Sequence, residues 1–194
     1  IAFIGSYGRK INEHISIGSS AKIINRTAGD FASAWGFGID ISSTYINNDW
    51  AVAVVAKDVT STFNVWRYQL SNEMINAFNS TNNELPENGL ELTLPRLIVG
   101  LSKVYEFKKN IHLLIEFNAD ITTDGKRNVL ISGNPFSIDP HIGGEFNIKD
   151  IVFIRGGIGN IQKTPDLTGE IIYTIQPNLG IGINIKGVEI EYAL

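Results

Sequence analysis

Apolar and polar residues alternate along most of the chain, most clearly in AWGFGIDISSTYI, residues 34–46. One face of this run carries large apolar side chains, interrupted by Ser43: Trp35, Phe37, Ile39, Ile41 and Tyr45. The opposite face carries small or polar residues: Gly36, Gly38, Asp40, Ser42 and Thr44. A period of two predicts a β-strand whose two sides meet different environments.

The same alternation predicts about ten strands and one helix. We place the strands at Ala2–Arg9, His14–Ile24, Ala34–Ile46, Trp50–Asp58, Leu97–Phe107, Ile111–Ile121, Phe136–Asn147, Ile151–Gly159, Ile171–Ile185 and Val188–Ala193. The fold class is therefore expected to be all-β and antiparallel.

The predicted connections alternate between short and long. Short links are expected at Lys10–Glu13, Asn47–Asp49, Lys108–Asn110, Ile148–Asp150 and Lys186–Gly187. Long links are expected at Asn25–Phe31, Val59–Arg96, Thr122–Pro135 and Asn160–Glu170. This order is typical of an up-and-down transmembrane barrel with periplasmic turns and extracellular loops. A Greek-key sandwich has no reason to keep it.

The polar face consists mostly of Gly, Ser, Asn and Thr with scattered charges, which suits an enclosed lumen. A soluble sandwich would place Lys and Glu along its wet face. The apolar face then points to lipid, with an aromatic girdle near the short turns at Tyr45, Trp50, Tyr105 and Phe107. A lipocalin-like soluble barrel and a β-sandwich remain as alternatives.

Composition agrees with one β-barrel domain over residues 1–194. Only 19% of the residues are charged, against roughly 25% in an ordinary soluble domain. The net charge of −4 gives no basic footprint for nucleic acid. No run of about 18 apolar residues exists, which excludes an α-helical span. The chain opens on IAFIGSYGRK, which reads as a strand, so we expect it to be part of a longer product.

Charged residues on the polar face form the candidate site. We expect a lumenal hydrogen-bonded network of Asp40, Glu116, Asp120, Asp139, His141, Glu145 and Arg155. His112, Glu116 and Asp120 are too far apart for one metal, because residues four apart on a strand are separated by roughly 13 Å. The glycines of GGIGN and LGIGINIKG do not join a strand to a helix, so nucleotide binding is not expected. No cofactor, metal or catalytic group is predicted.

Two charges strain this pattern. Lys103 falls on the apolar register, close enough to a short turn to extend its ammonium group toward the interface. Arg155 falls on the inward register and needs a carboxylate partner, for which Asp139 and Glu145 are the candidates.

The segment Val59–Arg96 is the longest predicted connection. Met74, Ala77 and Phe78 recur at helical spacing in SNEMINAFNS, so a short helix is expected there, followed by a break at NELPENG. The helix either packs over the barrel mouth or presents Met74, Phe78 and Leu85 to a partner.

Six stretches resemble the PorV/PorQ outer-membrane proteins of Bacteroidetes, which are associated with type IX secretion. They are GDFASAWGFGIDISSTY, NDWAVAVVAKDVTSTFNVW, ELTLPRLIVGLSKVYEF, ADITTDGKRNVLIS, SIDPHIGGEFNIKDIVFIRGGIGNIQ and QPNLGIGINIKGVEIEYAL. They occur in family order over nearly the whole chain.

The resemblance implies a fourteen-stranded, FadL-like barrel, of which about ten strands lie here, without N-terminal strands and a closing C-terminal strand. It also implies a non-enzymatic role in protein secretion. One branch binds the C-terminal signal domains of exported proteins and shuttles them, and another is a structural subunit of the attachment complex. The expected partners are therefore type IX secretion proteins or their cargo, together with outer-membrane lipid. The alternative function is FadL-like transport of small hydrophobic molecules.

Overall fold

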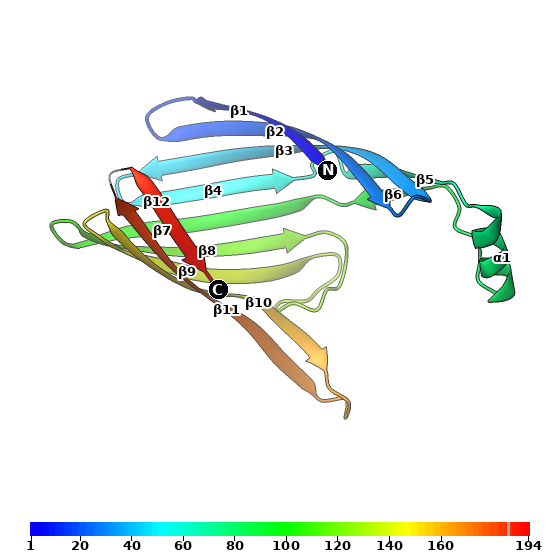
Figure 1. The fold of residues 1–194 in the computed structure, drawn as a ribbon. Helices are drawn as coiled ribbons and strands as arrows, with labels where there is room; N and C mark the ends of the chain where they lie inside the picture. Colours follow the sequence, from blue (N-terminus) through cyan, green and yellow to red (C-terminus); the bar gives the residue numbers. More distant parts are fainter. Residues whose placement is uncertain (186) are drawn as a thin grey trace.

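The computed structural model describes residues 1–185 and 187–194, which form antiparallel β-structure with one short helix (Figure 1). The elements are β1 (Ala2–Lys10), β2 (Ile15–Ala28), β3 (Ala32–Asn47), β4 (Trp50–Lys57), β5 (Thr62–Tyr68), α1 (Asn72–Ser80), β6 (Gly89–Thr93), β7 (Arg96–Lys108), β8 (Ile111–Thr122), β9 (Ser137–Ile148), β10 (Val152–Pro165), β11 (Ile171–Ile185) and β12 (Val188–Ala193). The all-β, antiparallel prediction is confirmed.

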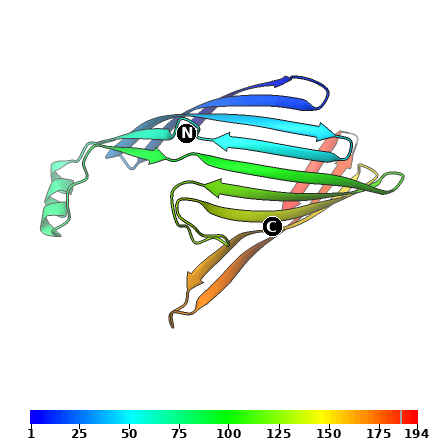
Figure 2. The same cartoon turned by 180° about the vertical axis from the view of Figure 1, so that it is seen from behind.

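Ten strands follow one another in a single path, β1-β2-β3-β4-β7-β8-β9-β10-β11-β12. Each of them pairs antiparallel with the next, and β1 and β12 are the two edges of an open sheet. The sheet is strongly curved, so that β12 lies in front of β4 in Figure 1 and behind it in Figure 2, which is the opposite view. No helix among the described residues has the length and apolarity needed to cross a membrane.

The segment Val59–Arg96 is not the loop that the sequence predicts. β4 pairs with residues 41–47 of β3, and β5 pairs with residues 32–37 of the same strand, so β5 prolongs β4. In the same way β6 pairs with β5 while β7 pairs with β4. The two halves form one long hairpin, interrupted at residues 58–61 and 94–95. Asp58 and Ser61 have φ angles of 55° and 54°, which break the strand locally.

Two further expected long links are also shorter. β2 continues to Ala28 and β3 begins at Ala32, so only residues 29–31 connect them. β10 runs to Pro165 and leaves residues 166–170 as its turn. In both places polar residues continue the strand pairing of the sheet. The alternation of apolar side chains does not reveal these strand ends. The expected turn Lys186–Gly187 includes Lys186, which lies outside the described residues.

The two faces of the sheet differ sharply in exposure. On β3 the apolar positions Trp35, Phe37 and Ile41 are exposed, while the alternate positions Gly36 and Gly38 are buried. Side chains crowd together on the concave side of a curved sheet. The polar face is therefore the concave one, and the apolar face looks outward.

Candidate functional site

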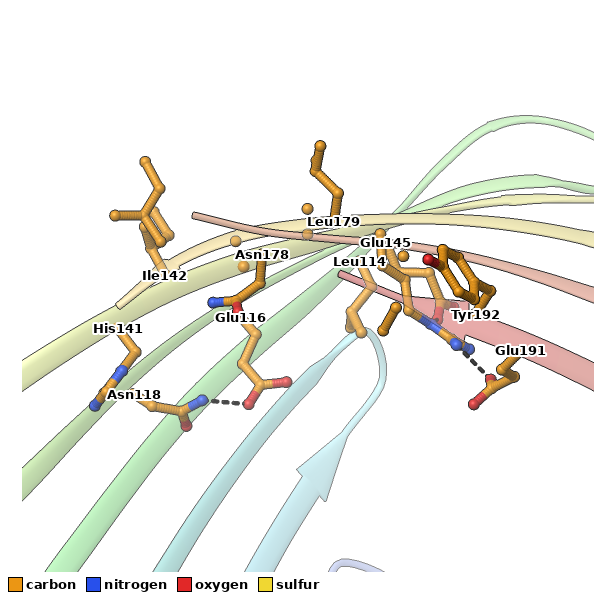
Figure 3. Close-up of a pocket in the computed structure, with 18 residues that line it drawn as sticks. Leu114, Glu116, Asn118, His141, Ile142, Glu145, Asn178, Leu179, Glu191 and Tyr192 are labelled. Carbon is orange, nitrogen blue, oxygen red and sulfur yellow. Dashed lines mark hydrogen bonds and ion pairs between the residues drawn. The ribbon is translucent and has the colours of Figure 1, made fainter. Parts of the chain in front are cut away.

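A hollow of about 490 Å³ lies in the sheet where β8 to β12 meet. Figure 3 shows Glu116, Asn118 and His141 pointing to one side of the strands, and Ile142 and Leu179 pointing to the other. Gly143 and Gly157 sit opposite each other in register and leave the floor of the hollow without side chains. We call this site the polar hollow; its polar lining consists of Glu116, Asn118, His141, Glu145, Arg155, Asn178 and Glu191.

Arg155 is the centre of charge in the polar hollow. Its Nε donates to Glu145 Oε2 at 2.5 Å, its Nη1 donates to Glu191, and its Nη2 lies 4.0 Å from a carboxylate oxygen of Glu189. Arg155 stands directly opposite Glu145 on β9 and opposite Gly180 on β11. Because Gly180 has no side chain, the guanidinium reaches across β11 to β12.

The partner of Arg155 is therefore Glu145, one of the two carboxylates that the sequence proposed. Glu189 and Glu191 were missed, although their spacing of two on a strand places them on one face. Three carboxylates against one guanidinium give this cluster a formal charge of −2. Such a cluster favours cations and ordered water over anions.

Asp139 and Asp120 form a second group, two residues farther along β9 and β8 than His141 and Asn118 of the polar hollow. They face each other across β8 and β9, and each has a different side chain beside it, an arginine or a histidine. Asp120 Oδ2 accepts from Arg96 Nη1 at 3.1 Å, and Asp139 Oδ2 lies 3.6 Å from His141 Nε2. Glu116 accepts from Asn118 Nδ2 at 2.5 Å. These contacts link neighbours in pairs and do not join into one continuous network.

Asp40 lies in a third group, on β3, far from the polar hollow along the sheet. Lys22 Nζ lies 2.8 Å from Asp40 Oδ1 and 2.6 Å from Asp58 Oδ1. Thr62 also donates to Asp58, whose backbone N–H donates to Asp40 at 2.9 Å. We call these four residues the lysine cluster. It fixes the interruption between β4 and β5, and only the cross-strand register brings its members together.

Helix α1 stands beyond the end of the β5–β6 hairpin, away from the sheet (Figures 1 and 2). Ser71 caps it by accepting from the Met74 backbone N–H at 3.3 Å, and no residue of the helix is buried. The expected helix is confirmed, but it does not pack on the sheet. Met74 and Phe78 are half-buried and Leu85 is exposed, so the segment projects apolar side chains.

Among the described residues, no three His, Cys, Asp or Glu side chains gather closely enough to hold a metal ion. Comparison with known proteins finds no protein-family profile and no curated protein that matches this chain.

Proposed function

We propose that this chain is part of a transmembrane β-barrel of the bacterial outer membrane. The observation that carries the proposal is the inverted exposure of the two faces. Trp35 and Ile41 are 59% and 50% exposed, whereas the side chains of Lys22 and Asp40 are 13% and 20% exposed. The buried apolar core of the described residues consists of Ala32 and Ala34 alone. A water-soluble chain of this length would bury many apolar side chains.

The dimensions of the apolar face support the same proposal. On β3 it extends from Trp35 to Tyr45, which is about 34 Å along the strand and about 25 Å across a membrane at the usual barrel tilt. Lys103 lies at one boundary, with its Nζ 4.7 Å from the ring centroid of Trp50 and 4.6 Å from that of Tyr105. A lysine held between aromatic rings is typical of the membrane interface.

Closure into a barrel would give hydrogen-bond partners to the backbone groups on the two open edges of the sheet. The outer strands β1 and β12 each expose one row of backbone N–H and C=O groups, which lipid cannot hydrogen-bond. The family resemblance implies fourteen strands, and additional strands between β1 and β12 would remove both edges. The short turns would then be periplasmic, with α1 on the extracellular side.

Within the membrane barrel, we assign a non-enzymatic role in type IX secretion, as a shuttle for exported proteins or as a subunit of the translocon or attachment complex. The projecting α1 segment supports this role, because Met74, Phe78 and Leu85 offer apolar contacts well away from the sheet. The family resemblance supplies the kind of partner, the C-terminal signal domain of an exported protein.

Photo-crosslinkers at Met74, Phe78 and Leu85 of the full-length protein in its native outer membrane test this role. We expect adducts with exported proteins or with secretion subunits, and far fewer from a matched crosslinker at the exposed Asn76 of the same helix. Adducts with lipid only, or equal capture at Asn76, would contradict the assignment.

FadL-like transport is the second candidate, and one feature favours it. Val55 and Ile98 are cross-strand partners on the polar face, as are Val104 and Leu114, so this face has two small apolar spots, one toward each end of β7. A fatty acid extracted in stoichiometric amount from the purified barrel would support transport over secretion.

A further inference from the structure

A second cavity lies on the apolar face, outside the candidate site. It has a volume of about 610 Å³ and opens where β2, β3 and β5 meet, at the end of the sheet away from the short turns. We call it the outer cavity; its side-chain lining includes Ile23, Trp35, Phe37, Phe63, Val65 and Arg67.

The cross-strand register orders this lining by polarity. Three successive rungs of the sheet meet at the outer cavity, which their β3 and β5 members line: Ile23–Phe37–Phe63, then Asn25–Trp35–Val65, then Thr27–Ser33–Arg67. The first rung is wholly apolar and the last is polar and cationic. The outer cavity therefore changes from apolar to basic along a single direction, toward the extracellular side of the proposed barrel.

Aromatic rings form the walls of the apolar part. Phe37 and Phe63 are cross-strand neighbours whose ring centroids lie 6.5 Å apart, and Trp35 stands beside them. All three rings are exposed to the surroundings of the protein. Ser33 and Gly36 also line the outer cavity, and their small size leaves space beside Trp35.

Arg67 is set apart from most other arginines of the chain. Arg26, Arg96, Arg127 and Arg155 each pair with a carboxylate. Over the described residues, no carboxylate lies within ion-pair distance of Arg67. A guanidinium at the rim of an apolar cavity is complementary to a phosphate that carries an acyl chain, since it binds phosphate oxygens in a bidentate fork.

We infer that the outer cavity holds one anionic, phosphate-bearing lipid of the outer leaflet, with its phosphate on Arg67 and an acyl chain against Trp35 and Phe63. This inference rests on the proposed membrane location of the barrel. It goes beyond general lipid contact, because it assigns one retained lipid to one place on the circumference.

Native mass spectrometry of the full-length protein in mild detergent, titrated with dioleoyl phosphatidylglycerol, tests the site. We expect one lipid to bind more tightly than the rest, with an affinity about tenfold lower in Arg67→Gln, the loss of one charge-assisted contact. Lys163→Gln is the matched control, because Lys163 lies over Tyr173 on a different strand and does not line the outer cavity. Equal loss in both variants, or no loss in either, would overturn the inference.

Two added ligands distinguish binding of a lipid phosphate from binding of a free phosphate ion. Inorganic phosphate alone should not displace the bound lipid, and dioleoylglycerol, which lacks phosphate, should bind equally to the native protein and to Arg67→Gln. Displacement by inorganic phosphate would mean a free anion site and would refute the lipid assignment.

Brominated phosphatidylglycerol in phosphatidylcholine vesicles distinguishes failure of the site from failure of the membrane proposal. We expect the bromine to quench fluorescence that Trp35→Phe removes, and more strongly than brominated phosphatidylcholine does, because the choline ammonium group of that lipid offsets its phosphate charge and Arg67 binds it more weakly. Equal quenching by the two lipids would refute the site while leaving the barrel intact. Absence of quenching by either lipid would refute the membrane location itself.

Discussion

Arg155 and Glu145 face each other directly across β9 and β10, and Arg155 Nε donates to Glu145 Oε2 at 2.5 Å. The same guanidinium reaches Glu191 on β12, so one side chain joins three strands next to an open edge of the sheet. This contact organises the charge of the polar hollow.

Replacing Arg155 by Met leaves the carboxylates of Glu145, Glu189 and Glu191 without the cation that they share. Since the Arg155 side chain is 36% exposed, solvent moderates the effect, and we expect a loss of about 1–2 kcal/mol in the free energy of unfolding. Urea unfolding of the full-length protein in vesicles measures it. The double variant Arg155→Met/Glu145→Gln should recover part of the loss. Strict additivity of the two single effects would contradict the pairing.

Gly38 makes room for the lysine cluster. A Cβ at this position would lie 2.0 Å from Thr62 Oγ1 and 2.9 Å from Lys22 Cε. Gly38→Ala should therefore destabilise the protein by about 1–3 kcal/mol, the usual cost of overpacking. Gly5→Ala is the control, because nothing lies within 4 Å of a Cβ there. Thermal unfolding of the two variants should differ clearly, and equal midpoints would show that the cluster does not depend on close packing.

The loop of residues 123–136 should become less ordered in acid, because protonation of Asp124 breaks its ion pair with Arg127. Arg127 Nε donates to both carboxylate oxygens of Asp124 at 2.9 Å, and this contact holds the pKa of Asp124 below its usual value. Because the folded pKa is depressed, the ion pair orders the loop above the ordinary carboxyl range. That ordering is lost as the pH falls through the folded pKa.

Hydrogen exchange at the Gly125 and Arg127 amides, corrected for intrinsic rates, follows this loss. Both amides are bonded within the loop region, to Pro135 O and Ser137 Oγ. The native protein should lose protection in acid below the ordinary carboxyl range, whereas Asp124→Asn should be less protected at neutral pH and vary little. An identical profile in both proteins would mean that Asp124 does not order the loop.

Lys103 should matter for its charge and not for its length. Lys103→Met removes two cation–π contacts and should cost about 1 kcal/mol, while Lys103→Glu should cost more because a carboxylate is repelled by both ring faces. Vesicle-inserted protein unfolded with urea provides the comparison. If Lys103→Met proved neutral or stabilising, the ammonium group would have no interfacial role.

The strands were predictable because each face of the sheet meets one environment along its whole length. The β5–β6 extension was not predictable as a continuation of β4 and β7, because Asp58 and Ser61 adopt left-handed backbone conformations that no alternation pattern reveals. Leu90, Leu92 and Leu94 alternate in the sequence and were the available signal.

The contacts between charged groups were likewise predictable only in part. Sequence placed Glu145 and Arg155 on one face, and their contact followed from adjacent strands in the predicted order. Lys22 lies on β2 and Asp58 directly follows β4, and their contact depends on the exact register of β2, β3 and β4. Register between several strands is not encoded in the alternation of any single strand.

Cysteine scanning of β3 with nitroxide spin labels tests the central claim most directly, since this chain has no cysteine of its own. In vesicles, labels at Trp35, Phe37 and Ile41 should collide mainly with oxygen, which concentrates in lipid. Labels at Asp40, Ser42 and Thr44 should collide mainly with a water-soluble nickel complex. Alternation with a period of two would support an outward apolar face in lipid. Labels at Trp35, Phe37 and Ile41 that are shielded from oxygen, or as open to nickel as their neighbours, would contradict it.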